Sequence, residues 1–527
     1  MKAINVLLAL LVSLLIALLV FEGGLRLFPA FRPSTSVNEF DAELGWSKKA
    51  NTNVSRSTGE FSIDFDINAS GLRDDDVTYE PAEGMFRVLC LGDSFTLGYT
   101  VDREHLFVDH LERYWGSQQR RVDVVNAGTE GYSTDQAVRW FQTEGKKYKP
   151  DVVLLFPYEN DIYWNGQERY QRYPKPRFDV NGDLETGTLE DPGPKGWQSS
   201  FALGNFLAKV VRPLVAKQDP SLGKFQPAGT DVWVMNEFAP LFKNEPDFVA
   251  DCKARTIGAL KALKADCDDV GAKLIVAPIP SESCIDDEEK ERFRKLGVAG
   301  LPDDHWSPDR PVDFFLSAAA SLDLATIDAR PQLKEAQKAG DKLYFQEEWH
   351  FTPAGNEAFA RVLVDRLDEE AIFPESHKAM PNTDPTFDVA DAKGGIPFWL
   401  KLYGGLWAVL GTCFVLTYPK DNKLVSFFGV GVMLALVFGI FMGVTKLMEL
   451  AGPNGPYLLL IFAAVILGFV IYKLGRRIGT IMELLQAFTL RGHWYLMPLV
   501  VVLLSIGSLL VVAASSPMIA PFIYTLF

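Results

Sequence analysis

The chain has 527 residues, which is room for more than one domain, and its formal net charge is −15 at pH 7. Residues 396–527 carry eight Lys or Arg and three Asp or Glu, a charge of +5, so the rest of the chain stands at −20. An acidic main part without a basic stripe argues against nucleic acid as a partner. The five cysteines do not make a disulfide framework, and no Cys or His spacing suits a metal, so we expect neither a metal nor a cofactor.

The chain begins with an apolar segment, residues 4–21, directly after Met1 and Lys2. Its length approaches the roughly 20 residues that cross a bilayer. Because no small-residue cleavage site follows, we expect residues 1–26 to be an uncleaved transmembrane anchor, with a cleaved signal peptide as the alternative. A globular domain is expected over residues 27–380.

Three apolar strands are predicted early in this globular domain. Each ends in polar or small residues that could take part in binding or catalysis. In chain order they lead into Gly92-Asp93-Ser94, into Asn126-Ala127-Gly128, and into Tyr158-Glu159-Asn160-Asp161. Open α/β sheets bind ligands at the carboxyl ends of their strands. Taken singly, each of these sequences is an ordinary turn or helix cap; their order along the chain is what favours a site.

Residues 163–244 interrupt this order and form a candidate lid or substrate wall. A helix over 245–269 and strands over 272–278 and 322–329 follow, and the alternation of strands with helices predicts a parallel sheet covered on both faces. A fourth sequence, Glu347-Glu348-Trp349-His350-Phe351-Thr352-Pro353-Ala354-Gly355, leads into a helix that ends near Leu367.

A polar linker, residues 381–395, precedes a predicted membrane domain over 396–527. Four segments are long and apolar enough to cross the bilayer, at about 398–418, 424–447, 457–474 and 495–514. If the N-terminus is cytoplasmic, the loops that carry Lys420 and Lys423, and Lys473 to Arg491, lie inside the cell, as basic loops prefer. The same orientation places residues 27–380 outside the cytoplasmic membrane.

Together the four sequences resemble the SGNH (GDSL-type) hydrolase family, whose signature blocks correspond to Ser94, Gly128, Asn160 and His350. Asn68-Ala69-Ser70-Gly71-Leu72-Arg73 resembles the lead-in of membrane-anchored bacterial members. The resemblance implies a flavodoxin-like parallel sheet, Ser94 as nucleophile and His350 as base. It also implies an oxyanion hole built from the N–H groups of Ser94 and Gly128 and the carboxamide of Asn160.

Two positions depart from the family pattern. The family has Asp three residues before the histidine, where this chain has Glu347, so the resemblance makes Glu347 the third catalytic residue, with Glu348 as a weaker substitute. The family usually has Gly two residues before the asparagine, where this chain has Tyr158. We expect Tyr158, with Asp93 and Asp161, to contribute to substrate binding.

These features predict a membrane-anchored bacterial serine esterase that acts on O-acyl, chiefly acetyl, esters of envelope glycans or lipids. A polysaccharide O-acetyltransferase with the same site and a non-catalytic subunit of a membrane complex are the alternatives. The C-terminal stretch resembles a small bacterial membrane-protein family of unknown function. We therefore expect the bilayer, the acylated substrate, and other membrane subunits or further copies of the chain as partners.

Overall fold

The computed structural model describes residues 18–19, 22–23, 37–58, 60–171, 173–193, 201–207, 223–297 and 301–377, and short helical pieces between 403 and 435. The chain divides into two units. The globular unit comprises Thr35–Pro194 and Gln218–Ala392, and the terminal unit comprises Met1–Ser34, Lys195–Lys217 and Lys393–Phe527. The site described below lies within the globular unit.

A five-stranded parallel sheet forms the centre of the globular unit, in the spatial order β13-β12-β7-β5-β6. Its strands are β5 (Phe86–Gly92), β6 (Val122–Asn126), β7 (Val152–Phe156), β12 (Lys273–Val276) and β13 (Ala325–Thr326). The chain adds β6 on one side of β5 and then β7 on the other side, as in flavodoxin-like sheets. Ligands bind at such a switch point. The predicted α/β class and flavodoxin-like sheet are confirmed.

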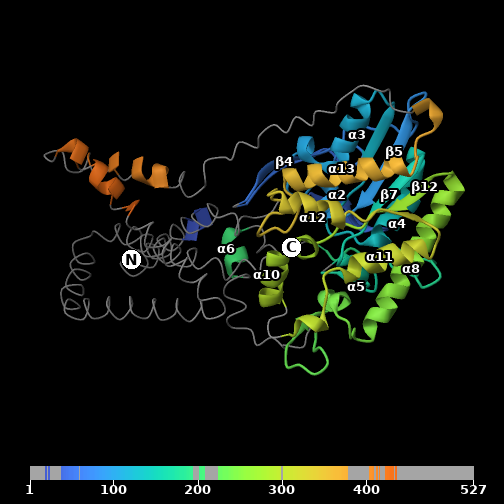
Figure 1. Ribbon diagram of the computed structural model, residues 1–527. Helices are drawn as coiled ribbons and strands as arrows, with labels where there is room; N and C mark the ends of the chain where they lie inside the picture. The colour runs from blue at the N-terminus through green and yellow to red at the C-terminus, as the bar shows by residue number, and fades with distance from the viewer. Residues whose placement is uncertain are drawn as a thin grey trace, which may run out of the picture. The chain divides into compact units, whose positions relative to one another are not determined.

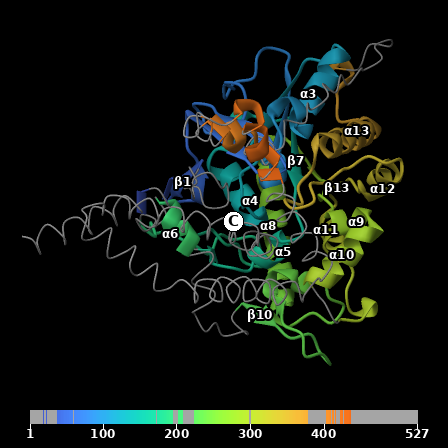
Figure 2. The same cartoon turned by 90° about the vertical axis from the view of Figure 1, so that its left-hand side faces the viewer.

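Helices cover both faces of this sheet because successive strand residues point to opposite faces and almost all of them are apolar. Figures 1 and 2 show α3 (Phe107–Ser117) and α13 (Pro353–Glu369) side by side over one face. The opposite face is covered by α4 (Thr134–Thr143), α8 (Phe248–Val270) and α11 (Arg310–Ala320). Within β5, Val88 and Cys90 belong to the hydrophobic core under α3 and α13, and Leu89 and Leu91 belong to the core under α4 and α8.

Two antiparallel hairpins precede the sheet in the chain: β1 (Asn38–Asp41) with β2 (Gly45–Lys48), and β3 (Thr52–Ser57) with β4 (Ser62–Ile67). Residues of β4 alternate strictly between exposed and buried, so Ile63, Phe65 and Ile67 form a small core with Val37 and Leu97. This contact brings the β3–β4 hairpin against α2 (Ser94–Leu97), the short helix that follows β5.

The region between β7 and α8 contains short elements. They are α5 (Asp161–Trp164), β8 (Arg169–Tyr170), β9 (Tyr173–Pro174), β10 (Lys224–Phe225), β11 (Val234–Met235) and the 3₁₀ helix η6 (Asn236–Leu241). The predicted insertion is therefore divided, because residues 195–217 belong to the terminal unit and the remainder to the globular unit. Within residues 201–207, the structure contains the short helix α6 (Ala202–Phe206).

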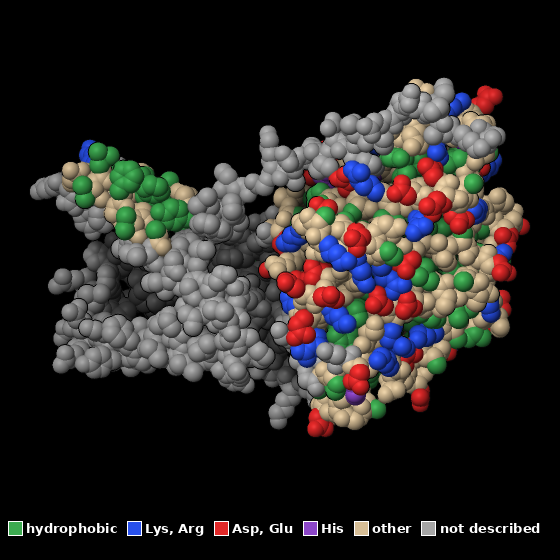
Figure 3. All heavy atoms as spheres, viewed as in Figure 1, with side chains coloured by type: hydrophobic (Ala, Val, Ile, Leu, Met, Phe, Trp, Pro, Cys, Tyr) green, Lys and Arg blue, Asp and Glu red, His purple; other side chains and the backbone are tan. Residues whose placement is uncertain are grey.

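The remaining elements of the globular unit are short. The α-helices are α9 (Glu282–Ile285), α10 (Asp287–Gly297) and α12 (Arg330–Lys338), and the 3₁₀ helices are η2 (Arg103–His105), η3 (Gly145–Tyr148), η7 (Asp303–His305) and η8 (Glu375–His377). Acidic and basic side chains are interspersed over the face of the globular unit shown in Figure 3. The four cysteines within the described ranges, Cys90, Cys252, Cys267 and Cys284, are all buried and free.

Most of the predicted transmembrane segments fall outside the described residues. Among the helices of the described ranges, none combines the length and the apolar character that crossing a bilayer requires. Residues 403–408 and 427–432 of the two predicted spans nearest the globular domain are helical. The other two C-terminal spans lie outside the described residues, as do the linker over 381–395 and most of the N-terminal anchor.

Candidate active site

Ser94 is the first residue of α2, immediately beyond the carboxyl end of β5. Asp93 caps this helix, and its carboxylate accepts a hydrogen bond from the backbone N–H of Phe95 at 2.9 Å. Burial raises the pKa of Asp93 to about 7. Backbone N–H groups in the first turn of a helix have no partner within the helix, and the role of the Ser94 N–H as an oxyanion donor stays a prediction.

His350, 256 residues further along the chain, meets this serine. The Oγ atom of Ser94 lies 2.8 Å from Nε2, and Nδ1 lies 2.7 Å from the backbone carbonyl oxygen of Glu348. A carbonyl oxygen only accepts hydrogen bonds, so Nδ1 carries the ring proton and Nε2 is left to accept from the Ser94 hydroxyl. This tautomer is the one that a general base requires.

The imidazole of His350 stacks on two aromatic rings. Its centroid lies 4.5 Å from that of Phe95 and 5.2 Å from that of Tyr99, with interplanar angles of 27° and 25°. Arg56 covers Tyr99 in turn, with its guanidinium carbon 4.3 Å from the ring centroid. These stacked rings limit the tilt of the imidazole, and the two hydrogen bonds at Nε2 and Nδ1 fix its orientation.

Burial is the largest influence on the pKa of His350, which it lowers to about 4. The hydrogen bond to Glu348 and the negative charge of Glu130 oppose this shift, while the positive charge of Arg56 adds to it. Arg56 and Glu130 form an ion pair with an N–O distance of 2.7 Å. The histidine is therefore neutral, and able to take a proton, at neutral pH.

The third member of the predicted triad is a carboxylate, Glu347 or, as the weaker substitute, Glu348. Glu347 is exposed, whereas Glu348 is half-buried. Burial, with the charges of Glu60 and Glu347, raises the pKa of Glu348 to about 7. The partner of Nδ1 in the structure is the Glu348 carbonyl, and the assignment of Glu347 as the catalytic carboxylate stays a prediction.

The predicted oxyanion residues lie at the ends of three adjacent strands, β5, β6 and β7. The N–H of Gly128 donates to the side-chain oxygen of Asn126 at 3.0 Å. A Cβ at Gly128 would lie 2.3 Å from the backbone nitrogen of Leu97, so only glycine allows this loop to approach α2. Asn160 is half-buried at the start of α5, and within the described ranges its carboxamide makes no hydrogen bond. Its role as an oxyanion donor, and that of Gly128, remain predictions.

The three predicted substrate-binding residues are packed or bonded within the protein. The ring of Tyr158 lies 4.8 Å from that of Phe95. Asp161 is buried and accepts a hydrogen bond from the Thr134 hydroxyl at 2.8 Å, and burial raises its pKa well above the usual range. Asp93 caps α2 as described above. Asp93 and Tyr158 thus contact Phe95 in α2, next to Ser94, whereas Asp161 contacts α4; substrate binding by all three stays a prediction.

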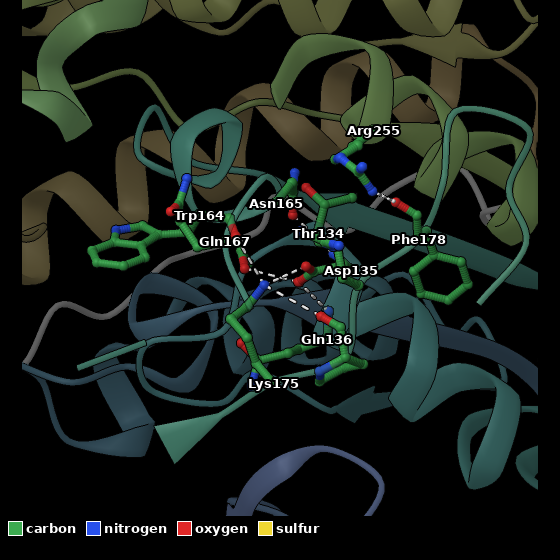
Figure 4. Close-up of polar contacts among 12 residues, drawn as sticks. Thr134, Asp135, Gln136, Trp164, Asn165, Gln167, Lys175, Phe178 and Arg255 are labelled. Atoms are coloured by element: carbon green, nitrogen blue, oxygen red, sulfur yellow. Dashed lines mark hydrogen bonds and ion pairs between the residues drawn. The ribbon is translucent and has the colours of Figure 1, made fainter. Parts of the chain in front are cut away.

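A buried polar network holds α5, the helix that follows Asn160 (Figure 4). Lys175 and Asp135 form an ion pair with both side chains almost wholly buried. The Nζ of Lys175 also donates to the carbonyl oxygen of Trp164, in α5, at 2.9 Å. Asn165 accepts from the Asp135 N–H at 3.1 Å and donates to Thr256 in α8 at 2.9 Å. The network thus links α4, α5 and α8 beneath the predicted oxyanion residue.

Sequence reasoning missed several residues that support the site. The buried Lys48 donates to the Gly128 carbonyl and the Thr129 hydroxyl, both at 2.7 Å, and burial lowers its pKa to about 7. Arg73, also buried, donates to the carbonyl oxygens of Leu97, Gly98 and Val101 at the end of α2. Arg73 belongs to the lead-in sequence that resembles the membrane-anchored family members, which was the available signal.

Residues 229–392 match a family model described as an SGNH hydrolase-like domain, acetyltransferase AlgX. The chain carries an SGNH hydrolase-like domain. This match includes His350, and the structure adds Ser94 from outside the matched range. The predicted family and the predicted class of enzyme, an SGNH-type serine hydrolase, are confirmed. Residues 478–527 match a family of unknown function, DUF5989, consistent with the resemblance expected for the C-terminal stretch.

No curated protein matches the chain. Among solved structures, an acetylxylan esterase from Geobacillus stearothermophilus is 11% identical, with a TM-score of 0.30, and the match covers 56% of this chain and 97% of the esterase. A lipase/acylhydrolase from Enterococcus faecalis is 16% identical, with a TM-score of 0.28, over 57% of this chain and all of the other. Similarity at this level says nothing about the substrate of the SGNH-like domain described here.

Proposed function

We propose that the globular unit is a serine esterase that removes O-acyl groups, chiefly acetyl, from glycans or lipids of the bacterial cell envelope. One observation carries the proposal: a serine at a helix start, 2.8 Å from the Nε2 atom of a histidine whose Nδ1 is held by a carbonyl oxygen. This geometry suits transfer of the hydroxyl proton to the ring as the oxygen attacks an ester. The family match to an SGNH hydrolase-like domain supports the same chemistry.

The reaction follows in two steps. Ser94 Oγ attacks the ester carbonyl carbon while His350 takes its proton, and the tetrahedral oxyanion is met by the proposed donors, the N–H groups of Ser94 and Gly128 and the Asn160 carboxamide. Collapse breaks the ester bond, and His350 returns the proton to the leaving alcohol. Water then attacks the acyl-serine while His350 takes a proton from it; the bond between the acyl carbon and Ser94 Oγ breaks, His350 returns the proton to Oγ, and the carboxylic acid is released.

A fluorophosphonate probe tests for the activated serine. We expect the full-length protein to be labelled covalently and Ser94→Ala to be unlabelled, because the probe reacts only with a hydroxyl whose proton is removed by a base. The control is Ser117→Ala. Ser117 is an exposed serine at the end of α3, so this variant should be labelled like the wild type. Absence of labelling in folded wild-type protein would contradict the proposal and favour a non-catalytic subunit of a membrane complex.

The second candidate is a polysaccharide O-acetyltransferase, which is favoured by the description of the matching family as acetyltransferase AlgX. Both reactions share the acyl-serine and differ only in whether water or a sugar hydroxyl attacks it. Release of acetate from an acetyl donor, measured with and without an acetyl-free glycan acceptor, separates the two. Acetate release that falls as acetylated glycan appears identifies a transferase.

The proposed site of action is outside the cytoplasmic membrane, with the N-terminus in the cytoplasm. This location rests on the apolar segments at both ends of the chain and on the basic residues in the loops between the C-terminal segments. The bilayer and an acylated glycan or lipid are the proposed partners, with other membrane subunits or further copies of the chain. Removal of both apolar ends, described in the Discussion, tests this part of the proposal.

A further inference from the structure

The loop that carries His350 is closed tightly upon itself. Tyr344 and Phe351 form an antiparallel bridge, the N–H of Phe345 donates to the carbonyl of His350 at 2.8 Å, and the N–H of Trp349 donates to the carbonyl of Phe345 at 3.0 Å. Trp349 has a φ angle of +54°, in the left-handed region that non-glycine residues seldom adopt. Such a conformation persists only when surrounding contacts hold it, and one set of these contacts comes from outside the loop.

The contact from outside the loop comes from Glu60, in the turn between β3 and β4. One carboxylate oxygen of Glu60 accepts from the N–H of Gln346 at 2.7 Å. The other accepts from the N–H groups of Glu347 and Glu348 at 2.9 and 3.0 Å. Three consecutive backbone N–H groups that converge on one anion form a nest, which binds a carboxylate with charge-assisted hydrogen bonds.

The hairpin turn is itself held in place beside the histidine loop. The Thr58 hydroxyl accepts from the N–H groups of Glu60 and Phe61 at 3.1 and 3.3 Å. The ring of Phe61 packs on Phe345 with centroids 5.6 Å apart. Glu60 therefore reaches the loop from a turn that is fixed on both sides, which makes its carboxylate a firm anchor for the loop.

These contacts fix four consecutive peptide planes that lead to the catalytic residue, those with the N–H groups of residues 346 to 349. Glu60 holds the planes that contain the N–H groups of residues 346, 347 and 348, and the Trp349 N–H fixes the next plane. That next plane carries the Glu348 carbonyl, which accepts from His350 Nδ1 at 2.7 Å. A carboxylate in the β3–β4 turn thus acts on the imidazole through the backbone.

We propose that Glu60 is a positioning residue for His350, which holds the Glu348 carbonyl against Nδ1 and so sets the tautomer and orientation of the catalytic base. This inference rests on the proposed function, because His350 must be the base for its position to matter. In a triad, a carboxylate side chain beside the histidine holds the tautomer and orientation of the imidazole. Here the Glu348 carbonyl takes that task, and the carboxylate of Glu60 holds the backbone that carries it.

Glu60→Gln tests the proposal in the full-length protein, because the amide keeps the size of the side chain but loses the charge and presents N–H groups to the nest. We expect kcat for p-nitrophenyl acetate to fall by about 10- to 100-fold, with KM within about two-fold, as misplacement of a catalytic group does. Glu60→Asp, which restores the charge on a shorter side chain, should recover part of the loss. Asp66→Asn, which removes a carboxylate from β4 of the same hairpin, should leave kcat unchanged.

A spectroscopic readout separates this proposal from the proposed function. In protein labelled with ¹⁵N-histidine, the Nδ1 proton of His350, identified by its absence in His350→Gln, should shift or exchange away in Glu60→Gln and stay in place in Asp66→Asn. An unchanged ring signal in Glu60→Gln overturns the proposal, as does full activity in Glu60→Gln with loss only in Glu347→Gln. If wild-type protein neither hydrolyses the ester nor reacts with the fluorophosphonate, the proposed function fails, and the ring signal alone decides the role of Glu60.

Discussion

At the scale of single residues, the pKa of His350 is set mainly by burial, with smaller and opposite effects from the charges of Arg56 and Glu130. Burial lowers the pKa of the imidazole to about 4, below the value near 6.5 for a free histidine. We therefore expect the acid limb of the kcat/KM profile to lie below pH 6.5, because the free enzyme keeps its base unprotonated into mild acid.

Substitution of the Arg56–Glu130 pair should move this acid limb in predictable directions. Arg56 lowers the pKa of His350, so Arg56→Gln should move the limb to higher pH. Glu130 raises that pKa, so Glu130→Gln should move the limb to lower pH. The measurement is kcat/KM against pH for each variant, with Arg366→Gln, whose ion pair lies on an exposed part of α13, as the control that leaves the limb in place. Shifts of the same sign in both variants would contradict this account.

At the scale of secondary-structure elements, the buried Lys175–Asp135 pair holds α5, the helix that follows the predicted oxyanion residue Asn160. Both members of the Lys175–Asp135 pair are buried, burial lowers the pKa of Lys175, and burial raises that of Asp135. Removal of one partner leaves the other as an uncompensated buried charge. We expect Lys175→Met to reduce the free energy of unfolding by about 3–5 kcal/mol, measured by urea denaturation followed through tryptophan fluorescence.

Two comparisons make this prediction specific to the buried pair. Lys264→Met removes one partner of a surface pair within α8 and should change the free energy of unfolding by less than about 1 kcal/mol. Lys175→Met combined with Asp135→Leu removes both charges, and it should be less destabilising than Lys175→Met alone, since no buried charge is then left unpaired. A double variant that is less stable than the single one would show that the pair itself stabilises the fold.

The sequence predicted the elements whose signals are local, and missed contacts between distant elements. Each sheet strand near Ser94, Gly128 and Asn160 is an apolar run that ends in turn residues, so its place in the fold was readable. Glu60 lies 286 residues from its first partner in the histidine loop, and no local pattern reports such a contact. The alternation Ser62-Ile63-Asp64-Phe65-Asp66-Ile67 is typical of a half-buried strand, and nothing in it indicates that the turn before it anchors a catalytic loop.

At the scale of the whole molecule, the catalytic pair and all of its described supports belong to one unit. The residues that hold Ser94 and His350 come from β2, the turn between β3 and β4, the segment with Arg73 that follows β4, α2 and the loop before α13, all within Thr35–Pro194 and Gln218–Ala392. The two cores that enclose the sheet also consist of residues from this unit.

We therefore expect a protein consisting of residues 35–392 to keep the reactive serine when the apolar ends are removed. It should react with the fluorophosphonate at a rate within a few-fold of the full-length protein, because the geometry around Ser94 and His350 depends on contacts that remain. Upon cell fractionation it should be found with soluble proteins, whereas the full-length chain should be found with membranes, because only the latter has the predicted spans. Full-length protein in the soluble fraction would contradict the proposed location. Loss of labelling in a shortened protein that still unfolds cooperatively would show that the terminal unit contributes to the catalytic site, and would favour a function carried jointly by the two units.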